Sequence, residues 1–148
     1  MSISDNSGEE TTEPIWLDVQ DVRAIHGEIL AESGGDSGIL SDGALESTLN
    51  KPKNLYCYKD GVDLFDLAAS YGYGLIKNHC FIDGNKRVAL IAVYTFLSIN
   101  EIELDATEAD AANFFLDLAA SVETQEQCME RLTDWLKLNS QPIDINLT

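Results

Sequence analysis

The chain is poor in several kinds of residue, and each scarcity excludes a class of protein. Only nine Lys and Arg residues stand against 26 Asp and Glu residues among 148, giving a formal net charge of −17. Such a chain repels nucleic acid and anionic membranes as a whole, so neither is expected as a direct partner. No apolar run reaches the roughly 18 residues that a membrane span needs. Three prolines and a hydrophobic content of 45% argue against a disordered chain.

Cysteine is also scarce and has no pairing pattern. Cys57, Cys80 and Cys128 are widely spaced, and no CxxC or Cys/His ligand spacing occurs, which argues against structural zinc. The N-terminus is acidic and polar, unlike a secretory signal. An odd cysteine count without such a signal predicts reduced thiols and a cytoplasmic location.

Positive charge is concentrated in one part of the sequence. Six of the nine basic residues lie between residues 51 and 87, together with only four acidic residues. A site for an anionic ligand needs such a concentration. The segment is equally explained as a stretch that happens to be less acidic, and the charge count alone favours that explanation.

Capping residues and apolar spacing predict an all-α domain. Helices are expected over residues 18–32, 42–50, 63–77, 85–99 and 107–122, and from residue 124 onward. Residues 51–62 are predicted as a loop or small hairpin, and residues 101–104 as a short extended segment. The helix from residue 85 is apolar on most sides and should be central and nearly buried. Its predicted core residues are Val88, Leu90, Ile91, Tyr94 and Leu97.

The chain length fits one domain. Residues 1–14 are polar, with four acidic residues and no basic one, which predicts a flexible acidic tail. The domain is expected over residues 15–138, and residues 139–148 are predicted as a C-terminal tail.

The segment over residues 79–87, His-Cys-Phe-Ile-Asp-Gly-Asn-Lys-Arg, combines groups suited to phosphate chemistry. It ends at the start of the predicted buried helix, where unpaired N–H groups favour an anion. Gly84 lets the backbone turn close to a ligand, and Asn85 can order that turn. Lys86 and Arg87 add two positive charges where phosphates would lie.

The same segment carries candidates for a metal ligand and a base. Asp83 is a hard oxygen ligand of the kind that magnesium takes beside nucleotide phosphates. A histidine side chain can accept a proton from a hydroxyl, so His79 is the candidate base. Phe81 is predicted to point inward, and nothing in the sequence specifies a nucleophilic role for Cys80. His26 lies in an amphipathic helix without acid–base companions and is interpreted as a structural histidine.

The pattern His-x-Phe-x-Asp-Gly-Asn-Lys-Arg resembles the core motif of the Fic/Doc (Fido) family, and most of all its Doc, or death-on-curing, branch. Gly34-Gly35, Gly38-Ile39 and the run from Gly43 to Ser47 also resemble that branch, and the resemblance covers roughly residues 17–138. It implies the Fic fold, a small helical bundle around the motif helix with a β-hairpin flap that docks the target. Lys53, Tyr56 and Tyr58 are candidates for that flap; the alternative is an exposed loop with ordinary side chains.

The resemblance also implies a role for each motif residue. His79 would be the general base that deprotonates a target hydroxyl. Asp83 would hold Mg²⁺ between the phosphates of ATP. The anion-binding nest would consist of Gly84, Asn85, Lys86 and Arg87.

Lys86 bears on which reaction the resemblance implies. Family members that transfer AMP usually have glycine at this position, and a second arginine follows a few residues later. In the Doc branch, a lysine here and the absence of that arginine accompany transfer of the γ-phosphoryl group to a threonine of elongation factor Tu. A Doc-like toxin with protein kinase activity is therefore the first interpretation. Protein adenylyl transfer (AMPylation) and a catalytically silent Fido binding module are the alternatives.

Two further departures concern partners. Leu40 and Ser41 stand where Doc-type chains commonly have Arg-Asp, which puts the usual partner contacts in question. The inhibitory pattern Ser/Thr-x-x-x-Glu-Gly/Asn of many family members does not occur in this sequence. The resemblance therefore implies inhibition by a separate antitoxin of the Phd type, which would place a helix in a groove.

Overall fold

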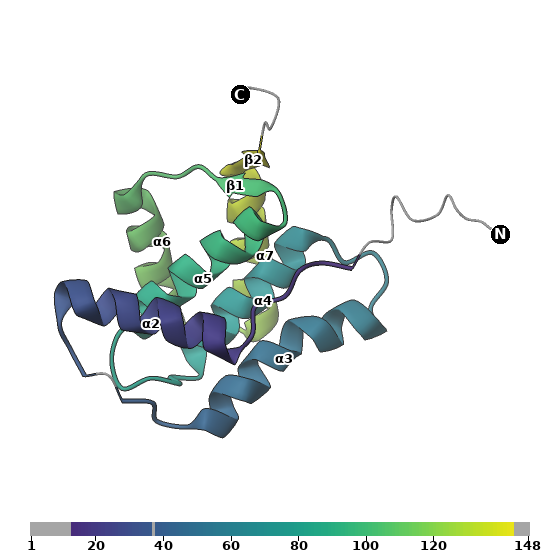
Figure 1. Ribbon diagram of the computed structural model, residues 1–148. Helices are drawn as coiled ribbons and strands as arrows, with labels where there is room; N and C mark the ends of the chain where they lie inside the picture. Colours follow the sequence, from purple (N-terminus) through teal and green to yellow (C-terminus); the bar gives the residue numbers. More distant parts are fainter. Residues whose placement is uncertain (1–12, 37, 144–148) are drawn as a thin grey trace.

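The structure is a computed structural model that describes residues 13–36 and 38–143 (Figure 1). Its elements in chain order are α2 (Val19–Ser33), α3 (Asp42–Tyr58), α4 (Leu64–Lys77), α5 (Asn85–Ile99), β1 (Ile102–Leu104), α6 (Glu108–Ala120), α7 (Gln125–Leu138) and β2 (Ser140–Pro142). The predicted all-α class is confirmed, with one small antiparallel sheet added. Within the described ranges, no helix is long and apolar enough to cross a membrane.

Helices α4 and α5 form the centre of the bundle (Figure 1). Helix α4 packs against α3, α5 and α7, whereas α5 packs against α2, α4 and α6. Gly72 allows this close packing, because a Cβ there would lie 2.9 Å from Val93 Cγ2 and 3.0 Å from Leu132 Cδ2. The two central helices meet the loop over residues 78–84, which joins them.

Side-chain caps fix where most helices begin. Four of the predicted helical ranges begin at the residue that is the N-cap in the structure: Asp18, Asp63, Thr107 and Thr124. Helix α3 differs from the prediction, because its N-cap is Ser41, whose Oγ accepts the Ala44 N–H, and Asp42 is already helical.

The predicted loop or hairpin over residues 51–62 is wrong for residues 51–58, and only residues 59–62 form a loop. Helix α3 continues through Tyr58, although Pro52 lies inside it. Leu45, Leu49 and Pro52 are all buried and repeat at helical spacing, so packing against α4 outweighs the hydrogen bond that proline removes. No flap forms here, and the flap candidates Lys53, Tyr56 and Tyr58 are helical.

Helix α5 has the predicted bounds, but one of its faces is more exposed than predicted. Val88 and Leu97 are buried as predicted, and Leu90 is half-buried, whereas Ile91 is 37% and Tyr94 45% exposed. Composition alone predicted an apolar core position for both. They lie one and two helical turns beyond Arg87 on the same face of α5, and the neighbouring helices leave that face partly uncovered.

The chain closes with a short strand pair. The extended segment predicted over residues 101–104 contains β1, and Glu103 of β1 pairs with Gln141 of β2 in antiparallel register. Strand β2 lies within the segment that was predicted as a C-terminal tail. Residues 1–12 of the predicted N-terminal tail and residues 144–148 lie outside the described part of the chain.

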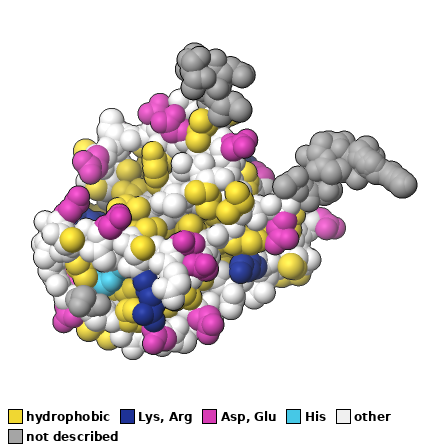
Figure 2. Space-filling view, in the orientation of Figure 1, with side chains coloured by type: hydrophobic (Ala, Val, Ile, Leu, Met, Phe, Trp, Pro, Cys, Tyr) yellow, Lys and Arg dark blue, Asp and Glu magenta, His cyan; other side chains and the backbone are white. Residues whose placement is uncertain are grey.

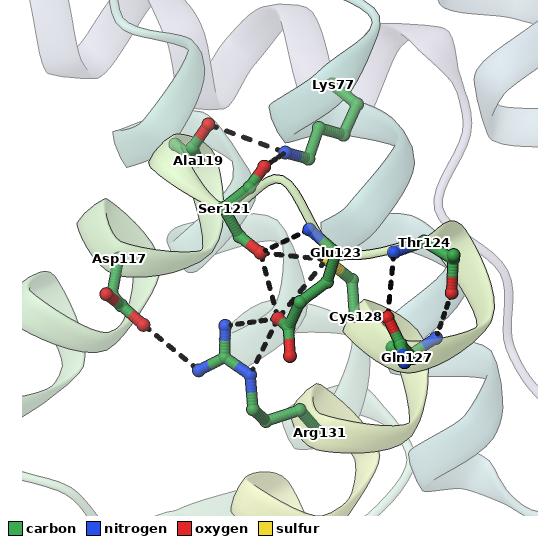
Figure 3. Close-up of polar contacts among 9 residues, drawn as sticks. All are labelled: Lys77, Asp117, Ala119, Ser121, Glu123, Thr124, Gln127, Cys128 and Arg131. Carbon is green, nitrogen blue, oxygen red and sulfur yellow. Dashed lines mark hydrogen bonds and ion pairs between the residues drawn. The ribbon is translucent and has the colours of Figure 1, made fainter.

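The turn between α6 and α7 is tied to the end of α4 (Figure 3). Arg131 pairs with Glu123 at 2.8 Å and with Asp117 at 3.1 Å, and hydrogen bonds from Ser121 and Arg131 hold the pKa of Glu123 below its usual range. Lys77 Nζ donates to two carbonyl oxygens at the end of α6. The last turn of α4, two residues before His79, is thereby held against the α6–α7 turn.

Candidate active site

The loop before α5 is closed by the Asn85 side chain. Asn85 Oδ1 accepts the Phe81 N–H at 3.1 Å, and Asn85 Nδ2 donates to the Phe81 carbonyl at 2.8 Å. Gly84, the N-cap of α5, has a φ of +85°, a conformation that favours glycine. Among the described residues, no side chain caps the first N–H groups of α5, so these groups are available to an anion.

Phe81 and His26 anchor this loop to α2. Their rings stack with centroids 4.0 Å apart, and both side chains are buried. His26 Nε2 lies 2.9 Å from the Asp83 carbonyl oxygen, an acceptor, so Nε2 carries the proton and donates it. His26 therefore holds the backbone at Asp83, as expected of a structural histidine.

The opposite side of the loop pairs with the segment before α3. The Leu40 N–H donates to the Cys80 carbonyl at 2.9 Å, and the Ile82 N–H donates to the Gly38 carbonyl at 3.1 Å. The two contacts form an isolated antiparallel bridge centred on Ile39 and Phe81. Burial raises the pKa of the Cys80 thiol, which favours an unreactive protonated group.

A pocket of about 340 Å³ opens where the end of α2 faces the start of α5. One wall comes from the end of α2 and the glycines after it; the other comes from the motif. The lining residues are Ile29, Leu30, Ser33, Gly34, Gly35, Asp83, Gly84, Asn85, Lys86 and Arg87.

The pocket holds two cationic side chains that form no ion pair with any described residue. Figure 2 shows acidic side chains spread over the visible face and few basic ones. Arg23 and Arg131 both form ion pairs with carboxylates, but Arg87 and Lys86 form none with any residue in the described ranges. Arg87 Nη1 instead donates to the Ser33 hydroxyl at 3.0 Å. Two cations at a helix N-terminus are unfavourable unless an anion compensates them.

Asp83 presents one carboxylate oxygen towards the pocket. Its Oδ1 accepts the Gly84 N–H at 3.0 Å, whereas Oδ2 has no hydrogen-bond partner in the part of the chain that the structure describes. A Cβ at Gly35 would lie 2.9 Å from Oδ2, and Gly35 has a φ of +113°, so only glycine allows this close approach.

The donor set fits one kind of metal site. No group of three or more His, Cys, Asp or Glu side chains able to hold a metal occurs among the described residues, so a cage of protein ligands alone is not formed there. A single carboxylate oxygen beside an anion-binding helix start suits Mg²⁺, which is held by one or two carboxylates and completed by phosphates and water.

His79 stands apart from the pocket. It is exposed, it has a φ of +47°, and it does not line the cavity. Its neighbours are held firmly: Asn78 Nδ2 donates to Thr48 Oγ1 at 2.7 Å, and Cys80 belongs to the bridge. A non-glycine residue in this conformation costs about 1–2 kcal/mol, which the surrounding contacts must offset. The imidazole is therefore presented to solvent at the start of the motif loop.

Comparison with known sequences identifies the family. The family model described as "Fic/DOC family" matches residues 16–97, more than half of the chain. The chain belongs to the Fic/DOC family. The matched range contains α2, α3, α4 and the motif loop, and so both walls of the pocket.

Two relatives show how far the similarity extends. "Protein kinase doc" of Escherichia phage P1 is 27% identical over 119 residues, which cover 80% of this chain and 90% of the phage protein. "Toxin Doc" of Mycolicibacterium smegmatis (strain ATCC 700084 / mc(2)155) is 37% identical over 91 residues, covering 58% of this chain and 62% of that protein.

The flap candidates are not brought to the pocket of this Fic/DOC chain. Lys53, Tyr56 and Tyr58 do not line it. Helix α3 starts beside the bridge and has 17 residues, so Tyr58 at its far end lies about 24 Å along the helix from Asp42.

The α2 wall contains contacts that sequence reasoning missed. The Gly34-Gly35 pair carried a signal, as part of the resemblance to the Doc branch. No sequence pattern indicated a role for Ser33, because its contact with Arg87 joins residues that are far apart in sequence.

Proposed function

We propose that this Fic/DOC protein is a Doc-like toxin that transfers the γ-phosphoryl group of a nucleoside triphosphate such as ATP to a Ser or Thr hydroxyl of a target protein. The observation that carries the proposal is the pocket at the start of α5. In this pocket, Lys86 and Arg87 form no ion pair with any described residue. Asp83 Oδ2 likewise accepts no hydrogen bond from a described residue. The names of the two relatives, a protein kinase and a toxin, support it.

Each motif residue has a role in this proposal. The N–H groups at the start of α5, with Lys86 and Arg87, bind the phosphates and the charge that develops on them during transfer. Asp83 holds Mg²⁺, which supplies charge neutralisation on the phosphates when bound. His79, at the exposed start of the loop, accepts the proton of the target hydroxyl. Positioning and electrostatics thus provide most of the catalysis, as phosphoryl transfer requires.

The target and the compartment follow from the resemblance to the Doc branch. We propose elongation factor Tu as the substrate and the cytoplasm as the place of action. Lys86, in place of the glycine of AMP-transferring members, favours γ-phosphoryl transfer over AMPylation.

The deciding experiment uses ATP labelled at either the γ or the α phosphate, with purified protein, Mg²⁺ and a cell extract containing elongation factor Tu. Label from the γ position alone is expected on a protein target, and a His79→Ala variant should lose it while keeping its fold. Label from the α position would instead identify a nucleotidyl transferase. Absence of any His79-dependent label, with no binding of Mg²⁺-nucleotide, would favour the silent binding module.

A Lys86→Gly variant tests the residue that separates the two reactions. We expect weaker γ-phosphoryl transfer, because a charge beside the phosphates is lost. Unchanged kinase activity would show that Lys86 does not set the reaction.

We further propose a separate antitoxin of the Phd type as the inhibitor. The uncovered face of α5 supports this partner, because Ile91 and Tyr94 continue from Arg87 along the helix, and Leu116 on the neighbouring α6 is 55% exposed. An amphipathic helix laid on this face would reach Arg87.

Charged substitutions test the antitoxin surface. Tyr94→Glu and Leu116→Glu should each weaken binding of a Phd-type partner at least ten-fold, because a carboxylate would have to be buried. Leu138→Glu is the matched control, since Leu138 is 84% exposed and lies on α7. Equal binding by all three variants would place the antitoxin elsewhere.

A further inference from the structure

Arg87 is held by an unusual partner for this chain. With 26 acidic residues present, its side chain contacts the neutral hydroxyl of Ser33, the last residue of α2. The other two arginines of the chain, Arg23 and Arg131, pair with carboxylates. Ser33 and Arg87 both line the pocket, from its opposite walls.

The hydrogen bonds of Ser33 have a defined direction. A serine hydroxyl has one proton, and the Ser33 Oγ lies 2.8 Å from the Ile29 carbonyl but 3.4 Å from that of Gly34. The proton therefore goes to Ile29, within α2. The oxygen lone pairs remain for Arg87 Nη1, 3.0 Å away. Because the hydroxyl is itself fixed by the helix, it fixes one end of the guanidinium group.

We infer that Ser33 is a positioning residue that holds the Arg87 guanidinium in the pocket, ready for the phosphate chain of the nucleotide. An arginine side chain loses considerable conformational entropy when it is fixed, and a preformed contact removes much of that loss from the binding step. This inference rests on the proposed function, because it assigns Arg87 an anionic substrate.

The neutrality of Ser33 is central to the inference. A carboxylate at this position would hold Arg87 equally well but would cancel its charge and repel phosphate. A hydroxyl accepts one N–H and leaves the charge and the other four guanidinium donors available. The residue at position 33 therefore affects both the position of the Arg87 guanidinium group and the charge beside it.

The first test observes Arg87 directly. The chain has three arginines, so ¹⁵N NMR of the guanidinium groups gives few signals, and an Arg87→Lys variant identifies that of Arg87. Rotation of the Arg87 guanidinium should be roughly five- to ten-fold faster in Ser33→Ala than in the unmodified chain, because one charge-assisted hydrogen bond is lost. Ser33→Thr, which keeps a hydroxyl, should restore slow rotation.

The second test measures affinity for inorganic tripolyphosphate with Mg²⁺, by calorimetry. Ser33→Ala should weaken binding roughly five- to ten-fold, and Ser33→Asp should weaken it further, on the order of 100-fold. Ser33→Thr should bind within about two-fold of the unmodified chain. Ser98→Ala, elsewhere on α5, is the matched control and should change nothing.

The outcomes separate this inference from the proposed function. If Ser33→Ala leaves both the rotation rate and the tripolyphosphate affinity unchanged, or if Ser33→Thr fails to restore them, Ser33 does not position Arg87. A chain that transfers no label but shows the expected changes would retain the Ser33–Arg87 relationship and lose the assigned reaction. Where transfer is observed, Ser33→Ala should raise the KM for nucleotide more than it lowers kcat, which a purely structural role would not do.

Discussion

Tyr71 places a phenol group in the centre of the bundle. Its hydroxyl accepts the Leu17 N–H at 3.0 Å, and the side chain is fully buried. Burial raises the pKa of Tyr71 to about 12, the hydrogen bond from Leu17 opposes that rise, and the nearby carboxylates Asp21 and Asp18 add to it. The phenol thus connects the segment before α2 to α4.

The raised pKa predicts an alkaline limit to stability. The folded chain keeps the Tyr71 proton between pH 10, the usual pKa, and about 12, whereas the unfolded chain releases it. The free energy of unfolding should therefore fall as the pH rises through this window, by up to about 2–3 kcal/mol from this group. Urea unfolding at pH 8, 10 and 11 measures the fall.

Tyr71→Phe isolates this contribution from the titration of other groups. At pH 8 the variant should be about 1–2 kcal/mol less stable, because the buried Leu17 N–H loses its acceptor, and its alkaline decline should be shallower. Tyr58→Phe, at a residue that is 75% exposed, is the control. If the free energy of unfolding falls equally steeply with pH in Tyr71→Phe and in the unmodified chain, the alkaline decline does not come from Tyr71.

Single residues of the motif were predictable because chemistry at this scale is local. The turn at Gly84, its closure by Asn85 and the inward Phe81 all follow from residues within one loop. The contacts of Ser33 and His26 with the motif were not predictable, because each joins residues more than 50 positions apart.

At the scale of elements, α3 offers a direct test of the corrected boundary. If residue 53 is helical, Lys53→Gly should lower the free energy of unfolding by about 1 kcal/mol relative to Lys53→Ala, because glycine is the poorer helix former. Urea unfolding of the two variants measures the difference. Equal stabilities of the two variants would instead indicate that residue 53 lies in a loop, as the sequence predicted.

The helices that were predicted correctly have caps and an uninterrupted apolar repeat. Helix α4 begins at the reciprocal pair of Asp63 and Asp66, and α5 begins directly after Gly84. The end of α3 was missed because Pro52 is ordinarily a helix breaker, and only its burial against the bundle shows why the helix continues. Strand β2 was missed because Ser140–Pro142 has neither alternation nor β-branched residues; its partner strand defines it.

At the scale of the whole molecule, the chain has a formal net charge of −17, and acidic side chains are scattered over the visible face (Figure 2). Mutual repulsion among the acidic groups disfavours the compact state, and salt screens it. The free energy of unfolding should rise by on the order of 1 kcal/mol between roughly 20 mM and 300 mM NaCl, levelling off as the screening length shortens to a few ångströms. A flat or falling salt dependence in urea unfolding would contradict this expectation.

The position of the candidate site could be predicted from the sequence, but the shape of the pocket could not. The motif predicted a site at the start of α5, where the structure has a pocket. Its second wall comes from the end of α2, and only the packed molecule brings that wall opposite Arg87.

The bridge between Gly38–Leu40 and Cys80–Ile82 bears on how this chain can diverge from its relatives. The bridge consists of backbone hydrogen bonds alone, and the Leu40 side chain is 61% exposed. Substitutions at position 40 other than proline therefore leave these backbone hydrogen bonds in place. Leucine in place of the arginine common in Doc-type chains is compatible with an unaltered pocket, and the rim of the site can vary in sequence while the backbone support of the motif loop is kept.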